Sequence, residues 1–357
     1  MDQNKMYYSD YLELDKILDA QHPESFKQAN QPAHDEMLFI IVHQAYELWF
    51  KQILFELEFV CNVFKKEKID DNSEDLNLVR HRLHRIVRIL ELLNQQVGLM
   101  DTMTPLDFLE FRNLLTPSSG FQSLQFRLVE AKLGLTIDMR HQQEYYKRTN
   151  EGGFTQTDFG MINKTETEDS LIQLINNWLE RMPFFEGEFW KNYQTPDEDL
   201  HPFWSDYRKI YKNGLTEREA TNINYFDLLF FESRKTLSDE QADSNKTTLS
   251  AKAMRAALFI MLYRDFPVFQ TSYQILDSLV EVDHQMAGWR HKHLVMVRRM
   301  IGMRTGTGGT SGSGYLEGAL TKHNIFNDIE RLSTFLIERK KLPRLPVELM
   351  QKLSYSL

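Results

Sequence analysis

The sequence predicts an all-α fold, and two observations support this prediction. Nearly every long stretch places its apolar residues three and four positions apart, which is the spacing of one helix face. Almost no stretch alternates between apolar and polar residues as a half-buried strand does. The chain has 357 residues, 42% of them hydrophobic, so it can bury a large core. The simplest expectation is a single helical domain over residues 1–357, with a separate role for about residues 1–33 and a peripheral insertion at about 195–246.

The predicted helices follow in order along the chain. Apolar spacing predicts helices over residues 35–65 and 73–97. Thr104 is a typical N-cap residue with Pro105 at the first helical position, so a helix is expected to begin there and to continue through Leu115. Further helices are expected at 119–135, 169–181, 252–263, 268–302, where a break near the start is left open, and 325–338.

Two stretches depart from the helical spacing. Residues 149–164 are polar and contain paired glycines, which predicts a loop. Residues 195–246 are polar, contain scattered aromatic residues and are weakly periodic, which indicates an inserted helical hairpin or lid.

Composition and charge exclude several classes of protein. The net charge of −9 and the even spread of charged residues argue against nucleic acid or an anionic membrane as the main partner. The longest apolar run, residues 256–263, is too short to cross a bilayer, and the first residues carry no basic-then-apolar targeting pattern. Cys61 is the only cysteine and lies in a stretch typical of a buried helix, so no intrachain disulfide is expected. These features together favour the cytoplasm.

One helix near the C-terminus carries a candidate ligand. Trp289, His293 and Met300 fall at i, i+4 and i+11, so they share a face, and His293 is expected to point toward the core. His291 is turned about 200° away around the helix axis and is expected at the surface. An inward imidazole needs a partner for its ring nitrogens, and that partner is a backbone carbonyl, a carboxylate or a metal.

A loop rich in glycine and hydroxyl residues, 305–315, follows this helix. Its backbone N–H and hydroxyl groups can approach an anion or a zwitterion closely. It lacks the Gly-Lys-Ser/Thr ending of a phosphate-binding loop, and no βαβ pattern surrounds it as in a dinucleotide site. A flexible connector, which is the commoner role for such composition, remains open.

A second histidine, His43, lies on the predicted helix 35–65. It shares a face with Phe39 and Tyr46, and the helix is apolar most of the way round, so His43 is expected to be buried. Such a residue is more often a satisfied core histidine than a catalytic one. Two inward histidines on different long helices of one core would instead allow one to bind a metal or cofactor and the other to face a substrate.

Arg112 and two tyrosines add candidate substrate contacts. Arg112 shares a helix face with Phe108 and precedes a Ser-Gly turn, a setting suited to bidentate capture of a carboxylate; a surface salt bridge is the alternative. Tyr8 and Tyr11 are three positions apart, so they can cover an apolar ligand together or simply fasten the terminus.

A di-iron centre is a distant alternative. Helical di-iron proteins use paired Glu-x-x-His motifs, and this chain contains Glu198-x-x-His201 and Glu281-x-x-His284. The first of these motifs is flanked by prolines, which do not suit an interior helix turn.

Three segments together resemble the tryptophan 2,3-dioxygenase family, which is haem-dependent. They are HDEMLFIIVHQAYELWFKQ (34–52), MTPLDFLEFRNLLTPSSGFQSLQFR (103–127) and WRHKHLVMVRRMIGMRTGTGGTSGSGYL (289–316), in the family's order and at similar spacing. The resemblance extends from about residue 7 to beyond residue 316 and is weakest across 195–246. Thr310 stands where serine is common, and Phe108 stands where some members have tyrosine.

The resemblance implies roles for the candidate residues. His293 corresponds to the proximal haem ligand and His43 to the distal histidine beside the indole nitrogen, while Arg112 matches the arginine that binds the substrate carboxylate. The remaining matches are Phe39 and Phe108 in the indole pocket, Ser119 and Gly120 at a turn over the haem, Trp289 beside the haem, Thr307 near the substrate ammonium and a haem propionate, and Tyr8 and Tyr11 in a neighbouring subunit's pocket.

The resemblance also implies a reaction, a cofactor and an assembly. A ferrous haem b supports addition of both atoms of O2 across the indole C2–C3 bond of L-tryptophan, which gives N-formyl-L-kynurenine. The protein is expected to be a homotetramer that exchanges its N-terminal segments. Two other functions stay open: an enzyme of the same fold that acts on another indole, and a helical scaffold or haem carrier without catalytic activity. The presence of both His43 and Arg112 argues against the second.

Overall fold

The computed structural model describes residues 6–69, 74–140, 153–185, 187–190, 201–231, 248–304, 316–318 and 323–353. Every regular element in these ranges is a helix, and none of them is a strand, so the predicted all-α class is confirmed. Short 3₁₀ turns lie at Glu24–Phe26, Arg112–Leu115, Gly120–Gln122, Ile137–Met139, Gly187–Trp190, Glu217–Glu219, Leu332–Phe335 and Arg339–Lys341.

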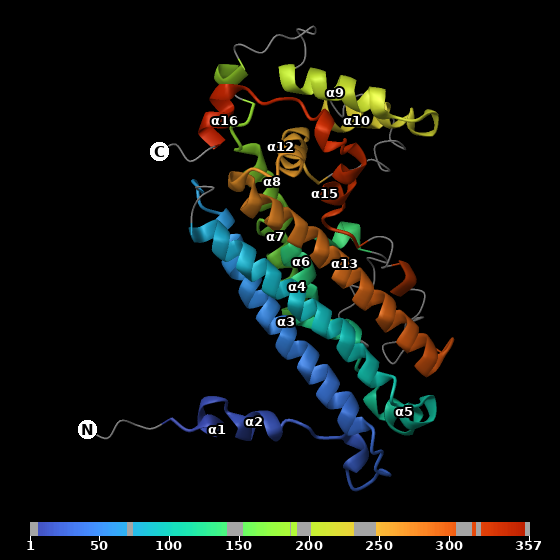
Figure 1. Cartoon of the computed structure of the whole chain (residues 1–357). Coiled ribbons are helices and arrows are strands. Elements are labelled where there is room, and N and C mark those ends of the chain that lie inside the picture. Colours follow the sequence, from blue (N-terminus) through green and yellow to red (C-terminus); the bar gives the residue numbers. More distant parts are fainter. Residues whose placement is uncertain are drawn as a thin grey trace, which may run out of the picture.

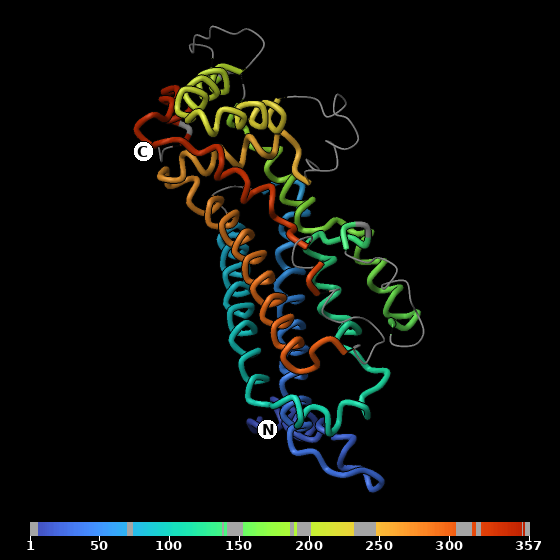
Figure 2. The backbone as a smooth tube through the Cα atoms, turned by 90° about the vertical axis from the view of Figure 1, so that its right-hand side faces the viewer, coloured from blue at the N-terminus to red at the C-terminus, as the bar shows by residue number. Residues whose placement is uncertain are grey.

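Three long helices form the body of the molecule. They are α3 (Glu36–Phe64), α4 (Glu74–Met100) and α13 (Pro267–Ile301), and they run side by side along its length (Figure 1; Figure 2). The buried positions of α4 include Leu76, Val79, Leu83 and Leu90, which repeat at three and four residues as expected for a helix with one apolar face. Their burial against α3 and α13 confirms the predicted inward face of α4.

Shorter helices close one side of this body. α6 (Leu124–Leu133) packs on α3, and α7 (Gln156–Thr167) packs on α6. α5 (Pro105–Phe111) begins at Thr104, whose side chain accepts from the Asp107 N–H while the Asp107 carboxylate accepts from the Thr104 N–H. This capping box confirms the predicted N-cap and fixes where the chain turns after α4.

The opposite end of the body carries α8 (Leu171–Glu180), α9 (Pro202–Gly214), α10 (Asn222–Phe230), α12 (Ala251–Leu262), α15 (Asn327–Arg331) and α16 (Val347–Leu353) (Figure 1). Residues 201–231 were predicted as part of a hairpin or lid, and they do form two helices. Their aromatic side chains, among them Trp204, Tyr207, Phe226 and Phe230, are buried in the main core. The sequence of this stretch is therefore only weakly periodic, although α9 and α10 each bury an apolar face in the core.

Parts of the secondary-structure prediction need correction. The helix predicted from Thr104 through Leu115 ends at Phe111 and is followed by a 3₁₀ turn, and the helix predicted at 119–135 begins only at Leu124. The predicted loop 149–164 is wrong from Gln156 onward, where α7 begins: Thr155 caps it by accepting from the Asp158 N–H, and Ile162 packs against Phe154. α13 runs without a break from Pro267, because a proline in the first turn of a helix costs no hydrogen bond.

The predicted helix 325–338 is also shorter than expected. α15 ends at Arg331 and tightens into a 3₁₀ turn that reaches Phe335. Tyr207 and Tyr211 of α9 donate hydrogen bonds to the Phe335 and Thr334 carbonyls, which takes these acceptors away from a continued helix.

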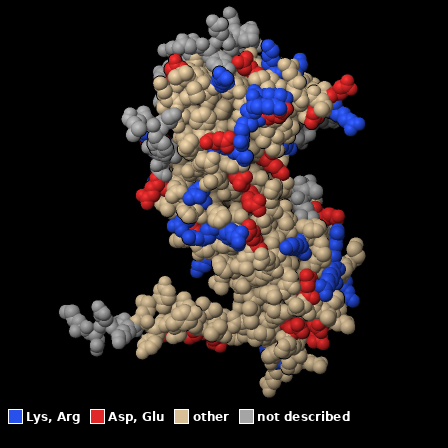
Figure 3. Space-filling view, viewed as in Figure 1, with Lys and Arg blue, Asp and Glu red and all other residues tan. Residues whose placement is uncertain are grey.

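The N-terminal segment projects away from the body. α1 (Tyr8–Tyr11) and α2 (Leu14–Leu18) form an arm beside the N-terminal end of α3 (Figure 1; Figure 3). The side chains of Tyr8 and Tyr11 are 75% and 69% exposed, and Leu18 is 73% exposed. Lys, Arg, Asp and Glu are interspersed over the face in Figure 3. No described helix is long and apolar enough to cross a membrane.

Candidate active site

A cavity of about 290 Å³ lies between the N-terminal half of α3 and the C-terminal half of α13, closed by the end of α4, by α5 and by α6. Most of the predicted site residues meet there: Phe39, His43, Phe108, Arg112, Ser119, Gly120, Trp289 and His293 all line this cavity. They come from segments that are more than two hundred residues apart in the chain. Helix packing alone brings them together.

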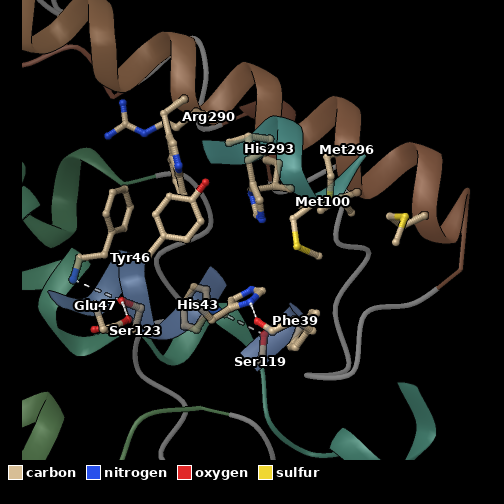
Figure 4. A pocket seen from close by; sticks show the side chains of 18 of the residues that line it. Phe39, His43, Tyr46, Glu47, Met100, Ser119, Ser123, Arg290, His293 and Met296 are labelled. Atoms are coloured by element: carbon tan, nitrogen blue, oxygen red, sulfur yellow. Dashed lines mark hydrogen bonds between the residues drawn. The ribbon is translucent and has the colours of Figure 1, made fainter. Parts of the chain in front are cut away.

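His293 projects from α13 into the cavity, opposite α3 (Figure 4). Its ring is stacked on Trp289, with ring centroids 5.2 Å apart and an interplanar angle of 5°. Burial, with smaller effects of His43 and Arg127, lowers the pKa of His293 to about 4, so the imidazole is neutral at pH 7. Its Nδ1 is buried and has no hydrogen-bond partner among the described residues. A neutral imidazole in an apolar cavity is the form that binds a metal ion.

His43 lies on the facing wall, on α3 (Figure 4). Its Nδ1 lies 2.6 Å from the Phe39 carbonyl oxygen, one helical turn earlier. A carbonyl can only accept, so Nδ1 carries the proton and donates it in this hydrogen bond. Burial lowers the pKa of His43, which keeps the ring neutral and leaves Nε2 as an unprotonated acceptor. The fold thereby selects the tautomer.

Aromatic rings form an apolar wall beside His43. The Phe39 ring is stacked on that of Phe108 at 5.8 Å, and Phe111 meets both rings edge-on. Phe111 is fully buried, whereas Phe39 and Phe108 are half-buried because they face the cavity. This wall is flat and apolar, which suits a planar aromatic ligand.

Polar groups lie at the edge of the aromatic wall. Arg112 is half-buried at the end of α5, one helical turn after Phe108, and lines the cavity. Ser119 caps the 3₁₀ turn that begins at Gly120: its hydroxyl accepts from the Phe121 N–H, and its own N–H donates to the Gln122 side chain. The turn expected from the sequence is therefore present and is held in place by its own hydrogen bonds.

Two predicted residues lie elsewhere, and a third is not among the described residues. Tyr8 and Tyr11 lie on the projecting arm and do not line the cavity of this chain. Thr307, with the rest of the glycine-rich loop, lies outside the described residues. His291 is exposed, as predicted from its position on the helix.

The structure gives no support to a di-iron centre. Within the described ranges, no group of three or more His, Cys, Asp and Glu side chains could hold a metal ion. His284 is exposed and lies near Glu281 and Glu330 at the surface. Glu198 lies outside the described residues.

Sequence reasoning missed a buried charge network on the cavity wall. Glu130 of α6 is completely buried and accepts from Arg127 at 2.8 Å and from Arg290 of α13 at 2.9 Å, with His323 Nδ1 3.8 Å away. Burial opposes ionisation of Glu130, but Arg127, the nearby His323 and Arg290 hold its pKa well below its usual range. His323 itself has a lowered pKa, chiefly because of burial. Glu130 therefore forms two buried ion pairs, one within α6 and one that links α6 to α13.

Two further lining residues were overlooked on α3. The Tyr46 hydroxyl donates to the Leu93 carbonyl of α4, and burial raises the pKa of Tyr46 to about 12. Glu47 accepts from the Ser123 hydroxyl at 2.6 Å and from Gln125, which ties α3 to the start of α6. The sequence could have indicated Tyr46, because it lies on the same apolar helix face as His43. Nothing in the sequence indicated Glu47, His323 or the pairing of Glu130 with Arg290.

Comparison with known proteins agrees with this geometry. Residues 1–336 match the family model described as tryptophan 2,3-dioxygenase. The chain is 42% identical to the tryptophan 2,3-dioxygenase of Bdellovibrio bacteriovorus over 98% of both chains. It is 39% identical to the protein of that name from Dictyostelium discoideum, over 99% of this chain and 89% of the relative. It is 40% identical to tryptophan 2,3-dioxygenase B of Danio rerio, over 95% of this chain and 84% of the relative. Matches of this extent, together with two neutral histidines facing each other across one aromatic-walled cavity, mean that the chain belongs to the tryptophan 2,3-dioxygenase family.

Proposed function

We propose that the chain adds both atoms of O2 across the C2–C3 bond of the indole of L-tryptophan and releases N-formyl-L-kynurenine, the first step of tryptophan degradation. Membership of the family makes the chain an oxidoreductase and a dioxygenase of tryptophan. The residue assignments rest on the cavity, which is lined by a potential metal ligand, a hydrogen-bond acceptor, an aromatic wall and an arginine.

The cofactor that the family implies is haem, and we assign its iron ligand to His293. The residues present are suitable for this group. His293 is neutral, its buried Nδ1 has no hydrogen-bond partner among the described residues, and Trp289 supports its ring. When bound in its ferrous form, haem b supplies the O2 chemistry that protein side chains cannot supply.

His43 orients the indole in this proposal. Its Nε2 is an acceptor because Nδ1–H donates to the Phe39 carbonyl, so Nε2 can accept the indole N–H. Phe39 and Phe108 provide the flat apolar wall for the six-membered ring. These contacts hold the C2–C3 bond in one orientation, and such positioning lowers the entropic part of the barrier.

Arg112 binds the substrate carboxylate, and Thr307 its ammonium group, in the same proposal. A guanidinium group at the rim of an apolar cavity forms strong paired hydrogen bonds with a carboxylate. Ser119 and Gly120 form the turn that closes the cavity over the cofactor. An indole without a carboxylate would forgo the paired hydrogen bonds with Arg112, and for this reason we favour tryptophan over other indoles.

We further propose a homotetramer in which Tyr8 and Tyr11 complete the pocket of a neighbouring subunit. The arm exposes these tyrosines and Leu18, which an isolated chain has no reason to present to water. A second exposed apolar row, Ile41, Leu48 and Phe55, follows one face of α3 at intervals of seven residues, as helix contacts between subunits require. We place the enzyme in the cytoplasm, which agrees with its single, buried cysteine.

The proposal is tested with purified, haem-loaded protein. An absorption spectrum establishes haem binding, and anaerobic reduction followed by addition of L-tryptophan and O2 should give N-formyl-L-kynurenine. With ¹⁸O2, both labelled atoms should appear in the product. Oxidation of tryptamine at the same rate as L-tryptophan would favour the alternative of another indole substrate, and absence of any product with bound haem would favour a haem carrier.

A further inference from the structure

A second cavity, of about 700 Å³, lies where α8, α9 and α12 meet, at the other end of the helix bundle from the candidate active site (Figure 1). None of its described lining residues is shared with the active-site cavity. A volume of this size is within the range of small-molecule sites, roughly 300–1,000 Å³. Nothing in the proposed dioxygenase reaction uses it.

Two cations lie on one side of this cavity. Lys252 and Arg255 are three residues apart in the first turns of α12, so both project from one face of the helix. Arg255 is half-buried and donates to the Phe230 carbonyl, and within the described part of the chain no carboxylate pairs with either residue. The one described acidic residue of the lining, Glu180, already accepts from Ser250 and Asn176. The N-terminus of α12 adds its own partial positive charge.

Two residues of this lining carry buried donors that have no acceptor among the described residues. His201 is the N-cap of α9, and its Nδ1 accepts from the Phe203 N–H at 3.3 Å, so the proton of the neutral ring is on Nε2. Burial, assisted by the charge of Arg255, lowers the pKa of His201 to about 4, which keeps the ring neutral at pH 7.

The second donor is the indole N–H of Trp204, a residue that is 1% exposed. In the described structure neither His201 Nε2 nor Trp204 Nε1 has a hydrogen-bond partner. Buried donors are rarely left without an acceptor, because each costs free energy. With Arg181 the lining holds three cations and one carboxylate, Glu180, so these charges and the two donors favour an anionic ligand.

Apart from Arg181, which donates to the Lys66 and Glu67 carbonyls, the rest of the lining is apolar. Leu179, Met182, Phe185 and Phe231 surround the polar groups. A bare inorganic anion would leave these side chains uncovered, whereas an organic acid would cover them. We propose that this cavity binds a small organic monocarboxylate, with its carboxylate on Arg255, Lys252 and the two N–H donors and its apolar part against this wall.

The test measures the binding of benzoate to the haem-loaded protein by isothermal titration calorimetry. Benzyl alcohol is the uncharged control, and inorganic phosphate tests whether charge alone suffices. Benzoate should bind, whereas benzyl alcohol and phosphate should bind at least tenfold more weakly. If benzyl alcohol or phosphate binds as tightly as benzoate, the proposal is wrong.

Matched variants locate the binding. Arg255→Gln should weaken benzoate binding by about tenfold or more, because a charge-assisted contact is lost. Lys252→Gln changes an exposed residue and cannot disturb folding through the core, and it should weaken binding severalfold. His201→Asn keeps an N-cap oxygen but removes the Nε2 donor, and Trp204→Phe removes the indole donor; each should weaken binding severalfold.

The control variant is Arg112→Gln in the other cavity, which should retain one benzoate site. Lys252→Gln should also leave tryptophan oxidation unchanged. Benzoate binding that survives both Arg255→Gln and Lys252→Gln, or that disappears in Arg112→Gln, would overturn the assignment to this cavity. Neither result would bear on the dioxygenase proposal, because the two cavities share no described lining residue.

Discussion

Replacing Glu130 with glutamine removes a completely buried carboxylate from the charge network at the cavity wall. Glu130 is completely buried, and the side chains of its partners Arg127 and Arg290 are 7% and 5% exposed. Neither guanidinium group can turn into water when the carboxylate is lost, so each loses a buried ion-pair partner. Removing one partner of a buried ion pair costs about 3–5 kcal/mol. We expect Glu130→Gln to lower the free energy of unfolding by about this amount.

Glu56→Gln is the matched control. Glu56 is equally inaccessible, but its partners Arg82 and Arg85 have side chains that are 30% and 50% exposed and can be hydrated after the change. The cost should therefore be nearer about 1 kcal/mol, the value of a lost hydrogen bond. Both variants and the parent protein, each loaded with haem, are compared by urea unfolding followed by circular dichroism. Equal losses of stability in the two variants would refute the argument that burial of the partner cations sets the cost.

Four further predictions concern the proposed chemistry. His293→Ala should abolish stable haem binding, read from the absorption spectrum, while His291→Ala should leave the spectrum unchanged because His291 is exposed. Arg112→Ala should lower kcat/KM for L-tryptophan by roughly a hundredfold, as expected for loss of a desolvated bidentate contact, and should change kcat/KM for tryptamine little. Burial lowers the pKa of His43, so the acceptor Nε2 persists to more acidic pH than in a free imidazole; the acid limb of kcat/KM should lie below pH 6.5, and a limb above that value would contradict the assignment. A chain beginning at Ala33 should still bind haem but should associate less tightly and turn over tryptophan far more slowly, and full activity as a monomer in light scattering would show that the arm has neither role.

Local signals in the sequence were sufficient for most of the helices. The capping box at Thr104 and the repeat of Leu76, Val79 and Leu83 depend only on neighbours along the chain, and both are present in the structure. The errors lie where tertiary contacts decide. α7 is held by a cluster in which Phe121, Leu124 and Leu128 pack against Phe154 and Ile162. The helix after residue 325 stops where tyrosines of α9 bind its carbonyls. No window of sequence contains both partners of such contacts.

In the candidate site, too, the local sequence predicts some properties and tertiary packing decides the others. The helical positions of His43 and His293 were enough to predict that both point inward, because the helix period fixes direction. The tautomer of His43 depends on its bond to the Phe39 carbonyl, and the neutral state of His293 depends on how completely the cavity excludes water. Those properties arise only from the assembled packing.

The buried network also links the stability of the fold to the orientation of the proposed iron ligand. Arg290 precedes His293 by three residues on α13, so the two side chains are separated by about 60° around the helix axis. Arg290 is held from two directions, by Glu130 on α6 and by the His323 carbonyl at 3.1 Å. These contacts set the rotation of α13 about its own axis, and that rotation decides whether His293 points into the cavity. A shift of one residue would turn His293 by about 100°, away from His43 on the facing wall. Charges buried beside a cofactor cavity are costly, and here they have a directional role that an apolar contact would not fulfil, because an ion pair requires one pairing of atoms and an apolar surface accepts many.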